Sequence, residues 1–148
     1  MGVDVVCRTS TRGVSRRALV AVGRRVLELL GRERSELSIA LVGNPEIRRL
    51  NARYRGQDRP TDVLAFPLEE RAPGCELLGD VVISVPKARE QARERGRSLA
   101  EEMATLLIHG ILHLVGYDHE RSPREARAMR RLERKLYREL CESRVLKV

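Results

Sequence analysis

The segment 99–115 constrains the fold most strongly, because apolar residues occupy every side of the helix that it predicts. Ser98 and Glu101 form a capping-box pattern at its start, and Gly116 follows its end. A helix that is apolar all round is stable only when other elements surround it. We therefore expect a central buried helix containing Leu99, Met103, Leu106, Leu107, Ile108, Ile111, Leu112 and Leu114.

The rest of the chain alternates between predicted strands and amphipathic helices. Strands are expected over residues 3–7, 37–42, 61–66 and 79–84. Other helices are expected to begin after the caps Ser15, Asn44 and Ser122 and at Pro86. The loop 69–76 has hairpin length, so the last two strands should be antiparallel. This order predicts one α/β (α+β) domain over residues 1–148, with a small four-stranded mixed sheet and about five helices.

All three histidines of the chain, His109, His113 and His119, lie close together in the sequence. The first two are four apart on the predicted helix and so share one face. Gly116 permits a turn that returns the third to them. Three imidazoles leave one position of a tetrahedral metal open, which is typical of catalytic zinc. The spacing therefore predicts one Zn²⁺ per chain, although nickel or copper suits the same ligands.

The residue after the first histidine bears on the type of chemistry. The spacing of the histidines equals that of the metzincin proteases, HExxHxxGxxH, in which a glutamate serves as general base. Here that position holds Gly110. A peptidase activity consequently loses most of its support.

The charge of the chain is strongly positive. Lys and Arg number 29 against 21 Asp and Glu, which gives a net charge of +8 and a pI near 10.2. Most of these cations are arginines, whose planar fork matches phosphate. This balance favours a nucleic-acid partner, and an arginine-rich solvated surface explains it equally well. On the first interpretation, arginines within 89–97 and 121–134 make non-specific phosphate contacts.

Cysteine usage and hydropathy indicate where the protein works. Cys7, Cys75 and Cys141 are odd in number and far apart, which argues against a disulfide framework. The first residues lack the apolar core of a signal peptide, and no apolar run reaches the length of a membrane span. We expect a soluble cytoplasmic protein with no membrane partner.

Three segments resemble a known family. The histidine segment 109–119 (HGILHLVGYDH) is similar to the signature of the YbeY family of bacterial endoribonucleases and rRNA maturation factors. Segments 51–56 (NARYRG) and 59–67 (RPTDVLAFP) resemble its second motif, and 78–84 (LGDVVIS) its third. The chain departs from the family at Ala65, where serine is expected, but one small residue replaces another.

The resemblance implies a function and its partners. Family members are single α/β domains in which three histidines, here His109, His113 and His119, hold zinc. They cleave single-stranded RNA and act in the maturation of the 16S rRNA 3′ end and in ribosome quality control. The implied partners are an rRNA precursor, the ribosome or its 30S subunit, and other ribosome-associated proteins.

The candidate catalytic residues are Arg55 and His113. The resemblance implies that Arg55 is the functionally important arginine, and its guanidinium suits the charge of a pentacoordinate phosphorus. Arg53 and Arg59, in the same polar segment, are expected to bind substrate. An activated water or the RNA 2′-hydroxyl can serve as nucleophile, and the sequence leaves this choice open.

Three aspartates are candidates for supporting the metal ligands through hydrogen bonds. They are Asp118, beside a ligand, and Asp62 and Asp80 on predicted strands. A structural role at a strand end is an equal alternative for the last two. Tyr117 can pack internally or stack on a base. Two further functions remain open: a ribosome-assembly factor with structural zinc, and a metal-dependent hydrolase of another substrate.

Overall fold

The computed structural model of the chain describes residues 2–68 and 76–147, with four strands and five helices. The strands are β1 (Val3–Cys7), β2 (Ser35–Val42), β3 (Val63–Pro67) and β4 (Glu76–Ser84). The helices are α1 (Arg16–Leu29), α2 (Asn44–Arg55), α3 (Val85–Arg95), α4 (Leu99–Leu114) and α5 (Pro123–Glu142). The predicted α/β class is confirmed, while nearly all of the predicted loop 69–76 lies outside the described residues.

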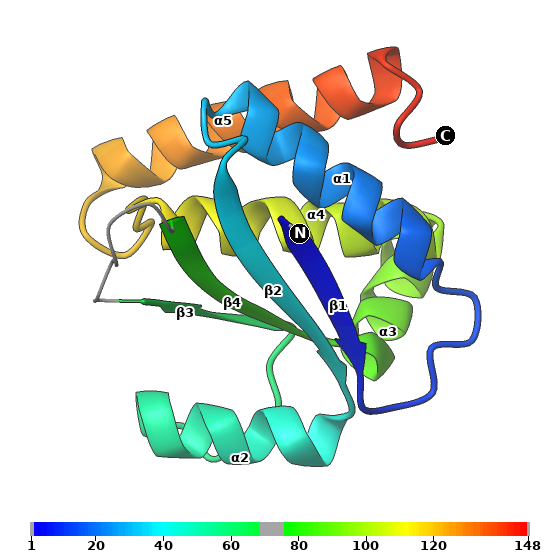
Figure 1. Cartoon of the computed structure of the whole chain (residues 1–148). Helices are drawn as coiled ribbons and strands as arrows, with labels where there is room; N and C mark the ends of the chain where they lie inside the picture. The colour runs from blue at the N-terminus through cyan, green and yellow to red at the C-terminus, as the bar shows by residue number, and fades with distance from the viewer. Residues whose placement is uncertain (1, 69–75, 148) are drawn as a thin grey trace.

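The strands form one mixed sheet in the order β1-β2-β4-β3. β1 and β4 each pair with β2 in parallel, and β3 pairs antiparallel to β4, as the short connection predicted. Parallel neighbours need a crossover, which α1 supplies between β1 and β2 (Figure 1). The sheet therefore places β3 at one edge, where it packs against α4.

Helices cover both faces of the sheet (Figure 1). On one face α4 lies between the sheet and α5, and α1 packs beside it. On the other face α2 covers a small apolar cluster that includes Ile47 and Leu64. Leu107, Ile111 and Leu112 of α4 are fully buried, so the prediction of a central buried helix is confirmed. In the described part of the chain, no helix has the combination of length and apolar character that crossing a membrane requires.

The helix caps follow the sequence prediction with one exception. Ser15, Ser98 and Ser122 each accept a backbone N–H in the first turn of their helices. The expectation that Asn44 caps α2 was wrong, because α2 begins at Asn44 and its cap is Gly43. The Asn44 side chain instead accepts a 2.7 Å hydrogen bond from the hydroxyl of Ser84, at the end of β4.

Candidate metal centre and its cleft

The three histidines meet at one point beside β3. His109 and His113 project from α4 one turn apart, and the chain then turns back to bring His119 to them. The ring centroids are 4.7 Å apart for His109 and His113, 5.3 Å for His109 and His119, and 5.2 Å for His113 and His119. One nitrogen atom from each ring lies within 4.8 Å of those of the other two. The structure thus brings the three predicted ligands together.

The turn after α4 is stabilised by backbone hydrogen bonds. The N–H groups of Gly116 and Tyr117 donate to the carbonyls of His113 and Leu112, at 3.1 and 3.0 Å. Gly116 has φ of +107°, a conformation that L side chains rarely adopt. Beyond it, Asp118 accepts a 2.9 Å hydrogen bond from the N–H of Glu120. These bonds hold the chain in the reversal that delivers His119.

The spacing of the histidine nitrogens fits zinc. The Nε2 atoms of His109 and His113 are 3.2 Å apart. Zinc–nitrogen bonds of about 2.0–2.1 Å in a tetrahedron separate two ligand atoms by about 3.3–3.4 Å. The three imidazoles would therefore hold one Zn²⁺ with a single position left for water or substrate.

Glu133 of α5 fixes the orientation of one candidate ligand, and the sequence analysis missed it. The Nδ1–H of His109 donates to Oε2 of Glu133 at 2.8 Å, so the lone pair of Nε2 faces the other two rings. Metal-bound histidines usually make such a bond through their second nitrogen. A signal was present in the sequence, because Glu133 interrupts the apolar stripe of α5 between Met129 and Leu136.

The protonation state of His113 suits a metal ligand. Burial lowers the pKa of this imidazole, and the neighbouring rings of His109 and His119 lower it further. The guanidinium of Arg55 acts in the same direction. His113 is therefore neutral at neutral pH, with its lone pair available.

The candidate metal centre forms one wall of a cleft of about 710 Å³. Residues of β3, of α4, of the end of α2 and of the turn after α4 line this metal cleft. They include Tyr54, Phe66 and Tyr117, which are three of the four aromatic residues of the chain. Tyr54 is 57% exposed, and its ring meets that of Phe66 edge-on at 5.1 Å. Concentrated aromatic surface in an aromatic-poor chain indicates a site for flat apolar groups.

The three candidate arginines lie in different places. Arg55 lines the metal cleft, where its Nη2 donates to Oε1 of Glu120 at 3.1 Å. The same carboxylate oxygen is 3.9 Å from Nε2 of His119. Arg53 lies over the ring of Tyr54, and Arg59 donates to the side chain of Gln57. The structure therefore places Arg55, and neither of the other two, among the residues that line the cleft.

The candidate aspartates are similarly divided. Asp62 and Asp118 line the metal cleft, while Asp80 is exposed and lines a separate hollow beside β1 and β2. Asp62 accepts hydrogen bonds from the N–H of Val63 and the amide of Gln91, which tie the start of β3 to α3. The N–H of Glu120 lowers the pKa of Asp118, so that carboxylate is ionised beside the histidines.

Gly110 is a point of close packing between α4 and β4. A Cβ atom at this position would lie 2.6 Å from Cγ1 and 3.0 Å from Cγ2 of Val81. Glycine therefore lets the helix approach the sheet closely enough to set the histidines against β3. The contact also leaves no room for the glutamate that a metzincin carries here.

Comparisons with known proteins agree with these observations. The family model described as "Endoribonuclease YbeY" matches residues 5–141. A Persephonella marina protein named "Endoribonuclease YbeY" is 44% identical over 128 residues, which are 85% of this chain and 84% of the relative. An Aquifex aeolicus protein of the same name is 45% identical over 129 residues, which are 87% of this chain and 86% of the relative.

A solved structure shares the fold. The solution structure of a Thermotoga maritima protein superposes with a TM-score of 0.66 at 31% identity, covering 96% of this chain and 91% of that one. The sequence match spans the strands, the helices and the histidine turn that build the metal cleft. The chain therefore belongs to the endoribonuclease YbeY family.

Proposed function

We propose that this protein is a zinc-dependent endoribonuclease that cleaves single-stranded RNA. It acts in maturation of the 16S rRNA 3′ end and in ribosome quality control. The observation that carries the proposal is the position of the three histidines on the wall of an open cleft. His119 is 43% exposed at its side chain, so a substrate can reach the fourth position of a metal held there. A purely structural zinc would have a closed ligand set.

The aromatic lining supports RNA in its single-stranded form. Unpaired bases stack on aromatic rings, whereas the bases of a duplex hide their faces. Tyr54 offers the most exposed ring of the cleft, supported from the side by Phe66. Tyr117 lines the same cleft beside the histidines. A strand with splayed bases could therefore lie along β3 with its backbone toward the metal centre.

Arg55 supplies positive charge where the reaction needs it. Its guanidinium would donate to the non-bridging oxygens of the phosphate and stabilise the charge that develops there. The 3.1 Å bond to Glu120 orients this side chain before substrate arrives. Zinc held by the histidines would add Lewis-acid stabilisation of the same phosphate. His113 is accordingly a metal ligand and a catalytic residue, and Arg53 and Arg59 are proposed to contact the strand outside the cleft.

The supporting aspartates and the absent glutamate complete the proposal. Asp118, ionised beside the ligands, would orient an imidazole or a water, and Asp62 holds the start of β3. Asp80, outside the cleft, is proposed only as a more distant support. The tight contact between Gly110 and Val81 removes the general base of a peptidase, which favours phosphodiester over peptide hydrolysis.

The partners follow from the family resemblance and the charge of the chain. We propose an rRNA precursor as substrate, the 30S subunit or ribosome as the assembly on which it is processed, and other ribosome-associated proteins as further partners. A net charge of +8 attracts such polyanionic surfaces. The proposed compartment is the cytoplasm, with no membrane partner.

The proposal is tested with purified protein and a defined unstructured RNA. Cleavage should require metal, so it should stop with chelator and return when zinc is added. His113→Ala removes a ligand, and Arg55→Glu places a negative charge beside the phosphate; both should abolish cleavage. Arg24→Glu is the matched control, because Arg24 is exposed on α1 and lies outside the metal cleft.

The outcomes separate the competing functions. Cleavage that survives both His113→Ala and Arg55→Glu would reveal a contaminating nuclease and refute the proposal. RNA binding without any cleavage would favour the assembly factor with structural zinc. Zinc-dependent hydrolysis of peptides but not RNA would favour the other hydrolase.

A further inference from the structure

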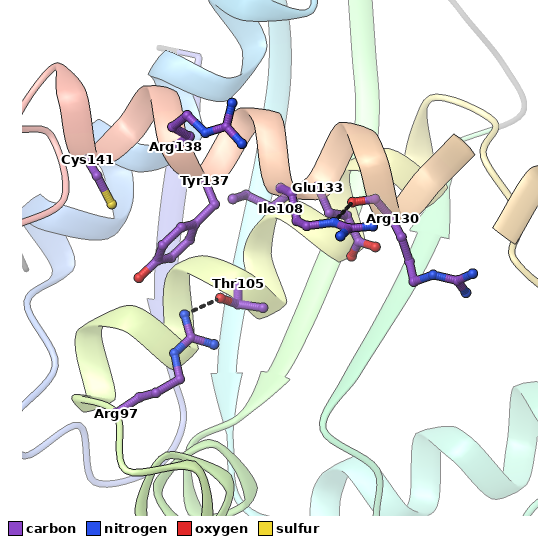
Figure 2. A pocket seen from close by; sticks show the side chains of 9 residues that line it. Arg97, Thr105, Ile108, Arg130, Glu133, Tyr137, Arg138 and Cys141 are labelled. Carbon is purple, nitrogen blue, oxygen red and sulfur yellow. Dashed lines mark hydrogen bonds between the residues drawn. The ribbon is translucent and has the colours of Figure 1, made fainter. Parts of the chain in front are cut away.

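A second concave surface lies between α4 and α5, distinct from the metal cleft. This α4–α5 groove has a volume of about 670 Å³ (Figure 2). Four arginines surround it: Arg130, Arg134 and Arg138 from α5, and Arg97 from the turn before α4. Its other lining residues are Thr105, Ile108, Glu133, Tyr137 and Cys141.

The positive charge that α5 contributes to this groove is not neutralised by ion pairs within the described residues. Across residues 2–68 and 76–147, no carboxylate lies within 4.0 Å of the guanidinium nitrogens of Arg130, Arg134 or Arg138. The groove contains one carboxylate, Glu133, and it already accepts the hydrogen bond from His109. Several arginines elsewhere on the surface are paired, such as Arg48 with Asp58 at 2.8 Å. Among the described residues, the three groove arginines of α5 therefore have no carboxylate that would balance their charge.

Arg97 is held in place on the α4 side of the groove. Its Nη2 donates to the hydroxyl of Thr105 at 2.9 Å, and Nη1 is 3.7 Å from the fully buried carboxylate of Glu102. The guanidinium lies over the ring of Tyr137, 5.2 Å from its centroid. Figure 2 shows Arg97 reaching Thr105, while Arg130 and Arg138 extend from the neighbouring helix α5. An anion in the groove would thus meet one ordered cation and several unpaired ones.

The groove adjoins the metal centre through Glu133, although the groove and the metal cleft have no lining residue in common. Glu133 lines it and also holds His109, and Thr105 lies one helical turn before His109 on α4. From Arg130 to Cys141 the groove follows α5 for about 16 Å, at 1.5 Å per residue. The groove therefore lies close enough to the metal centre to meet a strand bound there, with Glu133 between the two.

We propose that the α4–α5 groove binds phosphates of the RNA strand that flanks the scissile bond. The planar guanidinium groups of the arginines can each donate two hydrogen bonds to phosphate oxygens. The apolar surface at Ile108 can contact sugars and bases. This inference rests on the proposed function for its choice of RNA over an acidic protein segment. The groove acts as an extended substrate site, remote from the reacting atoms.

A matched pair of double variants on one helix tests this inference. Arg134→Gln with Arg138→Gln removes two charges from the groove. Arg131→Gln with Lys135→Gln removes two charges from exposed residues of α5 that do not line it. Binding to a fluorescent unstructured RNA of about 15 nucleotides, a length that exceeds most single-strand sites, is followed by anisotropy over a range of salt concentrations. Chelator is present throughout, so binding is measured whether or not the protein cleaves RNA.

The expected result is specific to the groove pair. If each arginine contacts one phosphate, the slope of log affinity against log salt should fall by about 1.4, twice the 0.7 per phosphate of single strands. The affinity at low salt should fall several-fold, and the outside pair should change neither quantity nearly as much. Thermal unfolding of each variant checks that it folds. If the groove double variant does not fold, the single variant Arg138→Gln is used in its place.

Three results would overturn the inference. Equal losses in both pairs would show that only the overall charge matters, and no loss in the groove pair would show that RNA does not enter the groove. Binding of labelled polyglutamate that is lost in the groove pair while RNA binding persists would assign the groove to an acidic protein segment. Loss of RNA binding in the groove pair alone, in a protein that cleaves no RNA, would refute the proposed function and leave the groove as an RNA site.

Discussion

Glu133 of α5 accepts a 2.8 Å hydrogen bond from Nδ1 of His109 on α4, which makes the last helix part of the candidate metal centre. Glu133→Ala should free the imidazole to rotate and lower zinc affinity by about 10- to 100-fold. Glu133→Gln keeps a hydrogen-bond acceptor for His109, so its zinc affinity should fall less than that of Glu133→Ala. Competition with a chromophoric zinc chelator measures the zinc affinity of both variants.

Glu139→Ala provides the control for this substitution, because Glu139 lies on the same helix away from the histidines. Its zinc affinity should equal that of the unmodified protein. Equal affinity of Glu133→Ala and the unmodified protein would show that the bond to His109 does not position the ligand.

Replacement of Gly110 tests the close approach of α4 to β4. Glycine to alanine within a helix normally stabilises by about 0.5–1 kcal/mol. Here the new Cβ would lie 2.6 Å from Cγ1 of Val81, so Gly110→Ala should destabilise by about 1–3 kcal/mol. Urea unfolding gives the free energy, and its sign decides between the two effects.

A double variant identifies the cause. Val81→Ala removes the two methyl groups that would lie closest to the new Cβ, and leaves only Cγ2 of Val63 at 3.4 Å among the nearest atoms. Gly110→Ala combined with Val81→Ala should therefore cost less than the sum of the single changes, by about 0.5–3 kcal/mol. Strict additivity would mean that the strain arises elsewhere.

Tyr54 is predicted to stack on a base of bound RNA. Tyr54→Ala should cost about 1–3 kcal/mol of binding free energy, or about 5- to 150-fold in affinity for single-stranded RNA. Tyr54→Phe keeps the ring and should bind normally. Because Tyr54 is 57% exposed, its removal should change the melting temperature little. Filter binding with single-stranded RNA and its duplex tests this, and an equal loss for both would argue against stacking.

The capping box of α4 predicts a component of acid sensitivity. The N–H of Ser98 and the hydroxyl of Tyr137 donate to Glu101 and lower its pKa below the ordinary value of 4.5. A lowered pKa means that the ionised group stabilises the folded state at pH values above 4.5, and that this stabilisation is lost as the pH falls through the folded-state pKa.

Glu101→Gln should isolate this contribution. The difference in melting temperature between the unmodified protein and the variant should be largest near neutral pH and should narrow steadily below pH 4.5. A difference that stays constant from neutral to acid pH would mean that the charge of Glu101 does not contribute.

Local patterns in the sequence predict the parts of this protein that depend on neighbours along the chain. A segment with apolar residues on every side, which starts at a capping box and ends before Gly116, predicted α4. The four-residue spacing predicted that His109 and His113 share a face. These predictions succeeded because helix geometry depends on near neighbours. The cap of α2 failed by one residue, since Ser84, 40 residues away, engages the Asn44 side chain.

Contacts between segments distant in the sequence determined the parts of the candidate site that local patterns did not predict. Glu133 reaches His109 across 24 residues and Arg55 reaches Glu120 across 65, while Tyr54 and Phe66 meet only because α2 ends beside β3. Such pairs depend on how the helices pack on the sheet, which no local pattern encodes. The sequence by itself determined which three histidines could meet and which helix carries the first two of them. The tertiary structure decided which carboxylate orients a candidate metal ligand, which arginine lines the cleft and which aromatic rings line it, because packing alone brings these residues together.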